Sequence, residues 1–514
     1  MTTGDAMLCT VPDLLLEPAR RQPDAAAVID GPSAMTYRQL ADRARSCAGF
    51  LSTNSSAGDR IALLLPRSAE TLAVFFGAHL AGLVPVFIHD QLRPRQAAHI
   101  VGNAQAALAI TTPRLRPTFR DCALPPGQIV DIGAVSGPPP LSVPRSIGRD
   151  LAVLAYTSGS TGSAKGVMLS HDNLVSGAVI VADYLGMSAA DRTLALLPWS
   201  FDYGLNQVLA TFAASGAVVI QRSAYPPDIC RTLASAEVSG MAGVPALWTA
   251  MTGPHSPLLR HQYPCLRYLT NSGGTLPVTV IRSLRAAHPG TAIYAMYGLT
   301  EAFRSTFLSP ALIDAKPTSI GQPIPNSDVL VIDDQDAICP AGAEGQFVHR
   351  GPTVAMGYWR DPAATAAVFR PLPARPRGSG QETVVYTGDY GYADADGDLY
   401  YRGRRDEMFK SRGIRTTPTE IESEILRSGL ISDLVVTAMP DASAEPVILL
   451  AVQPRDQSFS LDALQDYCRT ELAVHMRPHR ITVMDPIPRT PHGKVDRVLV
   501  RQMLAGRPGG EQAS

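Results

Sequence analysis

An excess of charge of one sign is missing from this sequence of 514 residues. Its 45 Lys and Arg residues are balanced by 46 Asp and Glu residues, so the formal net charge is −1 at pH 7. Proteins that bind nucleic acid or an anionic membrane surface usually carry a concentrated positive charge. We therefore expect neither nucleic acid nor a membrane among the partners, and a small ligand with local charge is more plausible.

Long apolar runs are also absent. Stretches such as residues 447–452 are much shorter than the roughly 20 residues of a membrane-spanning helix. The first residues lack a basic segment followed by an uninterrupted apolar one, so we expect no signal peptide. The seven cysteines are odd in number, scattered and without CxxC spacing, so no disulfide framework is apparent. These absences predict a soluble, cytoplasmic protein with reduced thiols.

Short apolar runs alternate with amphipathic stretches from Ile61 onward. Apolar runs at residues 61–65, 84–88 and 106–110 are separated by helical patterns at residues 68–80 and 93–103. This alternation is typical of βαβ units with a parallel sheet. A chain of this length is expected to form at least two domains. The first of them is therefore predicted to be α/β.

The pattern changes at residues 401–422, where a run of charged residues interrupts the alternation. A helix is predicted to begin at residues 417–426, and about a hundred residues of mixed strands and helices follow it. We place a domain joint at residues 403–406.

A segment rich in glycine and hydroxyl groups, TSGSTGSAKG at residues 157–166, follows an apolar run that predicts a strand at residues 151–156. Ser170 can cap a helix. The apolar face of that helix would be formed by Leu174, Ala178, Val181 and Leu185. We therefore expect the segment to be a loop that leads from a strand into a helix.

This loop has the composition of a phosphate-binding site. Its glycines free backbone N–H groups for an anion, its hydroxyls add donors, and Lys165 supplies a positive charge. The Walker motif does not fit, because Ala164 precedes the lysine and Gly166 follows it. A solvent-exposed loop rich in Ser and Gly is the structural alternative.

Six motifs resemble those of the adenylate-forming superfamily, which contains acyl-CoA synthetases, adenylation domains of nonribosomal peptide synthetases and luciferases. They occur in the family's order, and the resemblance covers roughly residues 12–505. Ala164 is a departure, since the family usually has proline there. The motifs are YTSGSTGSAKGVMLSHDNL (156–174), GGTL (273–276), YGLTE (297–301), YTGDYG (386–391), GRRDEMFKSRGIRTTPTEIE (403–422) and PRTPHGKVDR (488–497).

The resemblance implies an α/β fold with a large N-terminal domain, residues 1–402, of mixed β-sheets flanked by helices. A small α+β C-terminal domain, residues 407–514, would swing about a hinge at residues 403–406. A hinge is expected at the end of an element that can absorb a change of backbone dihedral angles.

The resemblance further implies that ATP and a carboxylic acid form an acyl-adenylate and pyrophosphate, after which a thiol displaces AMP. Such chemistry depends on positioning and on neutralising charge. The implied phosphate-binding residues are Thr157, Ser158, Gly159, Ser160, Thr161, Gly162 and Lys165. The implied adenine and ribose contacts are Gly273, Gly274, Thr275, Tyr297, Asp389 and Arg404.

Four residues have catalytic roles by the same resemblance. Thr300 would hydrogen-bond the α-phosphate, and Glu301 would hold Mg²⁺, which prefers oxygen ligands. Lys494 would bridge the carboxylate and the α-phosphate. Lys410 would reach the site after the domain swing, with Gly413 leaving room for a pantetheine arm. The expected cofactors are therefore ATP and Mg²⁺.

The acid is expected beside SFDYGLNQ, residues 200–207. Asp202 corresponds to the aspartate that receives the α-ammonium group in amino-acid-activating domains, but the motif also resembles fatty acyl ligases, where this aspartate meets no amine. The motif does not decide between these. Further pocket walls implied by the resemblance are Tyr203, Asn206, Asn271, Tyr294, Met296 and Phe303.

The predicted activity is that of an acid–thiol ligase with CoA or a carrier protein as acceptor. YGLTE and RTTPTEIE favour a stand-alone acyl or aryl ligase, and a carrier protein is expected to be a separate chain. The alternatives are an amino-acid carrier-protein ligase and an adenylating enzyme with a non-thiol nucleophile. An ATP hydrolase or kinase would release ADP, and a non-catalytic nucleotide-binding protein would lack Lys494.

His475 and His479 are four residues apart, a spacing that could place two zinc ligands on one helix face. Pro478 interrupts such a helix, and no third ligand lies nearby in the sequence. We therefore interpret both histidines as structural.

Overall fold

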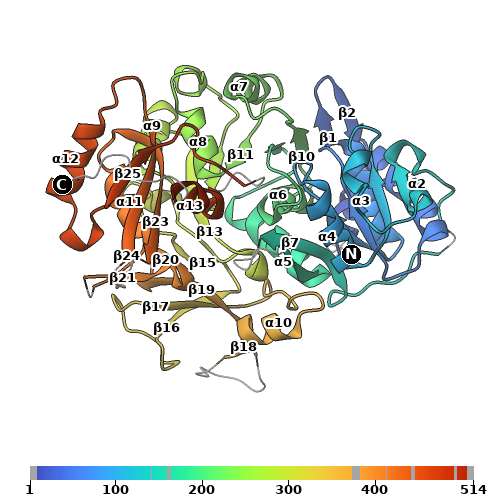
Figure 1. Cartoon of the computed structure of the whole chain (residues 1–514). Coiled ribbons are helices and arrows are strands. Elements are labelled where there is room, and N and C mark those ends of the chain that lie inside the picture. The colour runs from blue at the N-terminus through green and yellow to red at the C-terminus, as the bar shows by residue number, and fades with distance from the viewer. Residues whose placement is uncertain are drawn as a thin grey trace.

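The computed structural model divides the chain into a large N-terminal part, on the right and centre of Figure 1, and a smaller C-terminal part on the left. Among the residues that it describes, no helix combines the length and the apolar character needed to cross a membrane. The described residues are 8–140, 142–158, 164–372, 382–412, 414–440, 446–490 and 495–505.

The parallel βαβ arrangement predicted after residue 61 is confirmed. Strands β3 (Arg60–Leu63), β4 (Val84–Phe87) and β5 (Ala106–Thr111) alternate with helices α3 (Ala69–Leu80) and α4 (Pro94–Ala104). Strand β3 pairs in parallel with both β4 and β5. The short strand β6 (Ile129–Asp131) extends this sheet, and helix α2 (Tyr37–Asn54) packs on α3.

The largest sheet of the described residues has nine strands in the order β15-β14-β13-β12-β11-β9-β10-β1-β2. Their bounds are β1 (Ala26–Asp30), β2 (Ser33–Thr36), β9 (Arg192–Ala195), β10 (Ala217–Ile220), β11 (Gly240–Gly243), β12 (Tyr268–Asn271), β13 (Ala292–Tyr297), β14 (Thr306–Phe307) and β15 (Gln322–Pro323). The central strands are parallel, and the edge strands are antiparallel. The sheet is therefore mixed, as the resemblance implies.

Helices cover both faces of this sheet. Along β9, Leu194 packs in a cluster with α7 (Pro226–Ser235), α8 (Pro245–Met251) and α9 (Val278–Ala287). The next residue, Ala195, packs in a different cluster with α5 (His171–Tyr184) and α6 (Asp202–Ala213). Successive side chains of a strand point to opposite faces, so one short apolar strand contributes to two cores.

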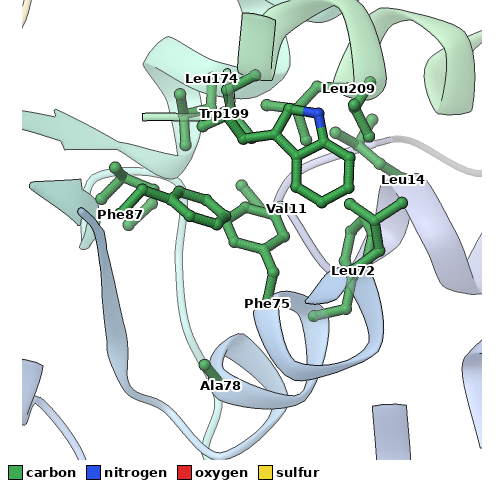
Figure 2. Packing of buried hydrophobic residues seen from close by; sticks show 14 of the residues in the cluster. Val11, Leu14, Leu72, Phe75, Ala78, Phe87, Leu174, Trp199 and Leu209 are labelled. Carbon is green, nitrogen blue, oxygen red and sulfur yellow. The ribbon is translucent and has the colours of Figure 1, made fainter. Parts of the chain in front are cut away.

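Trp199 anchors the segment that leads into α6. Its indole lies among Leu72 and Phe75 of α3, Leu14 of α1 (Asp13–Arg21) and Leu209 of α6 (Figure 2), and it is 4% exposed. The ring of Phe87 meets it edge-on, with 6.4 Å between the ring centroids. This packing fixes the position at which α6 begins.

The prediction that residues 157–166 form a loop leading directly into a helix is wrong, because a second strand lies before the helix. Strand β7 (Leu151–Ser158) pairs with a second strand, β8 (Ala164–Ser170), in an antiparallel hairpin, and α5 begins only after β8. Val167 and Leu169 of β8 are fully buried, so the segment gains more from pairing with β7 than as a loop. The N-terminus of α5 is therefore separated from the glycine-rich segment by the length of β8.

The predicted start of α5 is confirmed. The Ser170 hydroxyl accepts a hydrogen bond from the Asn173 N–H, and the Asn173 side chain accepts one from the Ser170 N–H, which forms a capping box. The predicted apolar face is buried at every position: Leu174, Ala178, Val181 and Leu185.

A second, antiparallel sheet of the N-terminal part carries the YTGD motif. Strand β19 (Thr383–Ala393) is its centre, and β20 (Leu399–Arg404) pairs with it so that Asp389 lies opposite Arg404. The remaining strands are β16 (Asp328–Ile332), β17 (Gly345–Arg350) and β18 (Phe369–Pro371), and α10 (Pro362–Val368) precedes β18.

The C-terminal part has a core of its own. Ile421, Val436 and Leu464 are buried together between helices and a sheet of order β23-β24-β25. The predicted helix near residue 417 is confirmed as α11, which Thr417 caps. The bounds are β21 (Phe409–Ser411), β22 (Ile414–Thr416), α11 (Pro418–Leu426), β23 (Ile431–Pro440), β24 (Pro446–Pro454), α12 (Leu461–Glu471), β25 (Arg480–Val483) and α13 (Arg497–Ala505).

Candidate functional site

Lys165 extends from β8 toward an aromatic ring. It lies opposite Thr157 in the hairpin, and its Nζ is 5.3 Å from the centroid of the Tyr358 ring. The chain around Tyr358 is held against β8, because the Trp359 N–H donates to the Gly166 carbonyl at 2.7 Å. A lysine over an aromatic face is stabilised without a carboxylate partner, so its charge stays available to an anion.

The other residues predicted for the phosphates are less fully described. Thr157 is half-buried at the end of β7. Ser158 belongs to β7, and its side chain lies outside the described part of the chain, as do the whole residues Gly159, Ser160, Thr161 and Gly162. Their role at the phosphates stays a prediction.

Tyr358 also contacts the carboxylate predicted to hold a metal. Its hydroxyl donates to Glu301 Oε1 at 2.7 Å. Glu301 and Thr300 lie in a single turn directly after β13. Burial of the phenol, with the neighbouring Glu301 charge, raises the pKa of Tyr358 well above its usual range. Tyr358 therefore remains a donor at neutral pH, and it joins Lys165 and Glu301 into one assembly.

Asp389 is held by two donors. The Tyr297 hydroxyl donates to Asp389 Oδ2 at 2.5 Å, and Arg404 Nε lies 3.3 Å from Oδ1. Burial and the Asp389 charge raise the pKa of Tyr297 well above its usual range, so it stays protonated. Asp389 is 7% exposed, whereas the Arg404 side chain is half exposed. The structure thus brings together three residues that are up to 107 positions apart in sequence.

The GGTL segment forms a tight turn after β12. Gly273 has a φ of 80°, a conformation that favours glycine. A Cβ on Gly274 would lie 3.1 Å from Pro245 Cγ, so little room exists for a side chain. Thr275 follows in the same turn. These residues and Tyr297 were predicted to contact adenine, and that contact stays a prediction.

Asp202 is the first residue of α6, and a cation lies beside it. Arg304 Nη1 is 3.8 Å from Asp202 Oδ2, and both side chains are at most 5% exposed. Arg304 Nε donates to Asn206 Oδ1 at 3.3 Å, and its guanidinium carbon lies 4.8 Å from the centroid of the Tyr203 ring. The predicted ammonium-binding carboxylate is therefore already paired within the chain.

A cavity opens between α5, α6 and the strands β9, β12 and β13. Three of the predicted pocket residues line it: Tyr203, Asn206 and Met296. Thr270 also lines it, and its hydroxyl is 2.5 Å from that of Tyr203.

The other predicted pocket residues lie elsewhere. Asn271 Nδ2 donates to the Gly274 carbonyl at 2.9 Å, and the Tyr294 hydroxyl donates to the Tyr184 carbonyl at 3.3 Å. Phe303 is fully buried in the core beneath α5. With Asp202, these three are not among the residues that line the cavity.

Tyr358 and Arg304 were missed by the sequence reasoning. Tyr358 lies 57 positions from Glu301, in an ordinary-looking GYW segment. Arg304 lies three residues beyond the end of the YGLTE motif, and its pairing with Asp202 depends on tertiary packing. In the sequence, Arg304 is marked only by its place after the apolar residues Ala302 and Phe303. Surface arginines occur in the same context, so this place does not indicate a buried ion pair.

The two predicted catalytic lysines cannot be placed by their side chains. Lys410 belongs to β21, where its backbone lies opposite Arg415 of β22, and its side chain lies outside the described part of the chain. Lys494 and Gly413 fall outside the described residues altogether. All three roles stay predictions.

One cluster of three carboxylates exists within the described ranges, at Asp394, Asp396 and Asp398. Lys316 Nζ lies 2.5–2.8 Å from an oxygen of each, so the cluster already has its cation. Glu301 does not belong to it; this half-buried carboxylate can offer a single oxygen ligand to Mg²⁺.

His479 has a structural partner, as interpreted from the sequence. Its Nδ1 accepts a hydrogen bond from the Ile448 N–H at 3.0 Å, and the backbone N–H of His479 donates to the Ile448 carbonyl. His475 lies in a separate short turn, Val474–Met476.

Comparisons with known proteins were made for the sequence and for the fold. Residues 15–359 match the family described as AMP-binding enzyme, and residues 420–494 match the AMP-binding enzyme C-terminal domain. The chain is 30% identical to a feruloyl-CoA synthase of Amycolatopsis sp, with 94% of this chain and 97% of that protein covered.

Two further similarities differ in how much of the other protein this chain covers. The chain is 29% identical to tyrocidine synthase 3 of Brevibacillus parabrevis over 95% of its own length, but it spans 8% of that protein. The solved structure of o-succinylbenzoate CoA synthetase from Bacillus subtilis, in complex with an acyl-adenylate intermediate, shares the fold with a TM-score of 0.86. That match has 24% identity and covers 97% of this chain and 99% of the other.

Proposed function

Because the chain belongs to the AMP-binding enzyme family, we propose that it is an AMP-forming acid–thiol ligase. In the first step, a carboxylate oxygen of the acid attacks the α-phosphorus of ATP. The bond from that phosphorus to the bridging oxygen breaks, and pyrophosphate leaves. In the second step, a thiolate attacks the carbonyl carbon of the acyl-AMP, and AMP leaves with the electrons of the broken C–O bond.

The observation that carries this proposal is the assembly around Tyr358. One phenol contacts Lys165, a cation with no carboxylate partner among the described residues and suited to the departing pyrophosphate, and Glu301, an oxygen ligand suited to Mg²⁺. Bound there, Mg²⁺ would neutralise charge on the phosphate oxygens. Thr300, next to Glu301, would donate a hydrogen bond to the α-phosphate. Preorganised donors and cations of this kind stabilise charge that develops during the reaction.

The ribose of ATP is assigned to Asp389. A carboxylate can accept hydrogen bonds from both ribose hydroxyls, and Tyr297 and Arg404 hold this one in a fixed position. Tyr297 and the turn at Gly273, Gly274 and Thr275 would then contact the adenine. Residues 157–162 would complete the phosphate site with their N–H and hydroxyl groups.

A swing of the C-terminal part is included in the proposal. Residues 1–402 would form the N-terminal domain, 403–406 the hinge and 407–514 the mobile domain. The separate core of the C-terminal part supports this division. Gly403 has a φ of 150°, and a Cβ there would lie 2.9 Å from Thr417 Cβ, so the joint requires glycine. Lys494 would serve the first step and Lys410 the second.

The acceptor is proposed to be CoA or the phosphopantetheine of a separate carrier protein. One relative that this chain covers almost entirely is called a feruloyl-CoA synthase, which favours CoA. Seven free cysteines agree with a cytoplasmic location. A non-thiol nucleophile is the alternative for the second step.

An amino-acid substrate is the second candidate, and one observation speaks against it. A substrate ammonium group at Asp202 would lie close to the Arg304 guanidinium, which already neutralises that carboxylate. Like charges in a buried site raise the free energy of binding. We therefore propose an acid without an ammonium group.

The test is exchange of labelled pyrophosphate into ATP with a panel of carboxylic acids. Exchange that depends on the acid and on Mg²⁺ is expected, with AMP and pyrophosphate as the products of turnover. If the best acid gives ADP and phosphate, the proposed reaction is wrong.

A further inference from the structure

The buried polar groups at the acid cavity indicate which kind of acid it accepts. Resting on the function proposed above, we propose that the tail of the acid carries an uncharged oxygen acceptor, a carbonyl or hydroxyl oxygen, that is bound by the Asn206 amide. The proposal depends on the position of Asn206, the orientation of its amide and the charge balance around it.

Asn206 is in the cavity wall and 1% exposed, yet part of it has no partner. Within the described residues, its Nδ2 makes no hydrogen bond. A buried amide N–H pair without a partner costs free energy that is recovered when a ligand oxygen accepts from it. The cavity wall is mixed. Val181, Leu185 and Met296 are apolar, whereas Gln207, also in the wall, has a buried Oε1 without a hydrogen-bond partner among the described residues.

Arg304 determines which end of the amide is free. Because Arg304 Nε can only donate, the atom of Asn206 that faces it, at 3.3 Å, must be the acceptor Oδ1. The amide NH₂ is therefore left for another partner. The ligand atom that fits the Asn206 amide is a hydrogen-bond acceptor, and the neighbouring Gln207 Oε1 can accept from the hydrogen of a ligand hydroxyl group. Arg304 is a positioning residue in this arrangement.

The charges around the amide select an uncharged acceptor. Asp202 and Arg304 are both buried, 3.8 Å apart, and their charges cancel. A second carboxylate on the substrate would add a net negative charge, and an ammonium group would add a positive one. Burying an uncompensated charge is costly, whereas an uncharged oxygen keeps the balance.

The experiment uses the full chain and acids that differ at one group. Octanoic acid is compared with the 4-, 5-, 6- and 7-oxo-octanoic acids, and 4-methylbenzoic acid with 4-hydroxybenzoic acid. Octanedioic acid and 8-amino-octanoic acid test the two charged tails. We expect at least one oxo or hydroxy acid to exceed its apolar counterpart by about tenfold or more in kcat/KM for pyrophosphate exchange. Preference for an apolar or charged acid in every comparison would overturn the proposal.

Asn206→Leu keeps the side-chain shape and removes the donor. In this variant the preferred oxygen-bearing acid should lose most of its advantage, so that its ratio to the apolar counterpart falls close to one. Met296→Leu is the matched control, because it alters the same cavity without removing a donor, and it should change both acids of a pair by the same factor. An unchanged ratio in Asn206→Leu contradicts the proposal.

Equilibrium binding separates this inference from the proposed function. The same acids are titrated into wild type and Asn206→Leu by calorimetry, with AMP present. If no acid supports exchange but the oxygen-bearing acid binds wild type more tightly than Asn206→Leu, the ligase proposal fails and the acceptor site stands. If exchange occurs with equal preference in both proteins, the acceptor site fails and the ligase stands.

Discussion

The nucleotide side and the acid side of the candidate site differ in how their polar groups are satisfied. On the nucleotide side, Asp389 accepts from Tyr297 and pairs with Arg404, and Glu301 accepts from Tyr358. On the acid side, Asn206 Nδ2 and Arg304 Nη2 are buried without a partner within the described residues.

This difference corresponds to two tasks, binding ATP, which every turnover requires, and discriminating between acids. The groups that hold ATP can be kept in position by hydrogen bonds within the protein, because ATP is the ligand in every turnover. An unpaired buried donor favours only ligands that satisfy it, and so it discriminates between acids. Changes on the nucleotide side should therefore affect all acids equally, whereas changes on the acid side should alter their ranking.

The largest expected effect is on the acid side. Arg304→Met leaves Asp202 buried and without its cation, so the free energy of unfolding should fall by about 3–5 kcal/mol. Denaturant unfolding followed by circular dichroism measures it. The double variant Asp202→Asn, Arg304→Met should recover much of the loss because both charges are removed. A loss below about 1 kcal/mol, as for an exposed ion pair, would show that the pair is not desolvated.

The next prediction tests whether the C-terminal part contributes one lysine to adenylation and another to thioester formation. Lys494→Ala should slow adenylation by about 100-fold or more, the scale of one lost contact to transition-state charge, and should still convert added acyl-AMP. Lys410→Ala should show the opposite pattern. Each half-reaction is measured separately, by pyrophosphate exchange and by thioester formation from synthetic acyl-AMP. Equal loss of both steps in both variants would contradict a two-step swing.

A third prediction concerns the pH dependence of stability and the residues His349 and Thr353, of which Thr353 contacts the Arg304 backbone. The Thr353 hydroxyl donates to the Arg304 carbonyl, so it accepts from His349 Nε2 at 3.1 Å. Within the described residues, His349 Nδ1 has no hydrogen-bond partner. Burial lowers the pKa of His349 to about 3. The unfolded chain takes up a proton near pH 6.5 and the folded chain does not. Stability from this group is therefore complete above pH 6.5 and is lost as the pH falls.

Between pH 7 and pH 5, His349 should contribute about 2 kcal/mol to the loss of stability. His349→Gln keeps an N–H donor for Thr353 and does not titrate. The difference in unfolding free energy between pH 7 and pH 5 should thus be smaller in this variant than in wild type by that amount. The same pH dependence in both proteins would mean that His349 is hydrated.

The smallest effect is on the nucleotide side. Tyr358→Phe removes the hydrogen bond to Glu301 and keeps the ring beneath Lys165, at a cost of about 1 kcal/mol, or roughly fivefold. We expect a higher Mg²⁺ requirement for exchange, by the same factor with every acid. Tyr386→Phe is the control, because it removes a similar hydrogen bond, from the hydroxyl of Tyr386 in β19 to Asp336 in the turn after β16. A change in the ranking of acids would remove the distinction between the two sides.

The fold was predictable where the signal is local. The parallel units after Ile61 and the caps at Ser170 and Thr417 follow from apolar spacing and from the residues that begin helices. Strand β8 was not predicted, because the glycine-rich segment before it and the helix cap at Ser170 after it together indicate a loop that leads into a helix. Its pairing with β7 is a hairpin whose buried face becomes evident only when Val167 and Leu169 meet the core.

At the candidate site, motifs name residues whose roles stay predictions. Glu301, Asp389 and Lys165 follow from short motifs, whereas their partner Tyr358 and the Asp202–Arg304 pair arise from packing between distant segments. Phe303 shows the converse case. It is adjacent to a motif and was expected in the pocket, but it adopts a φ of 43° and packs into the core beside Gly177.

The carboxylate cluster around Lys316 makes the chain suitable for selective amine labelling. Hydrogen bonds to Asp394, Asp396 and Asp398 raise the pKa of Lys316 well above its usual range, so its amine stays protonated and unreactive in mild base. The sequence contains four lysines, and the other three are Lys165, Lys410 and Lys494. Besides the α-amine of the N-terminus, an amine-reactive reagent would therefore report on the three lysines assigned to the reaction, and Lys316 would stay unlabelled. Three resolvable signals suffice to follow successive states of one turnover.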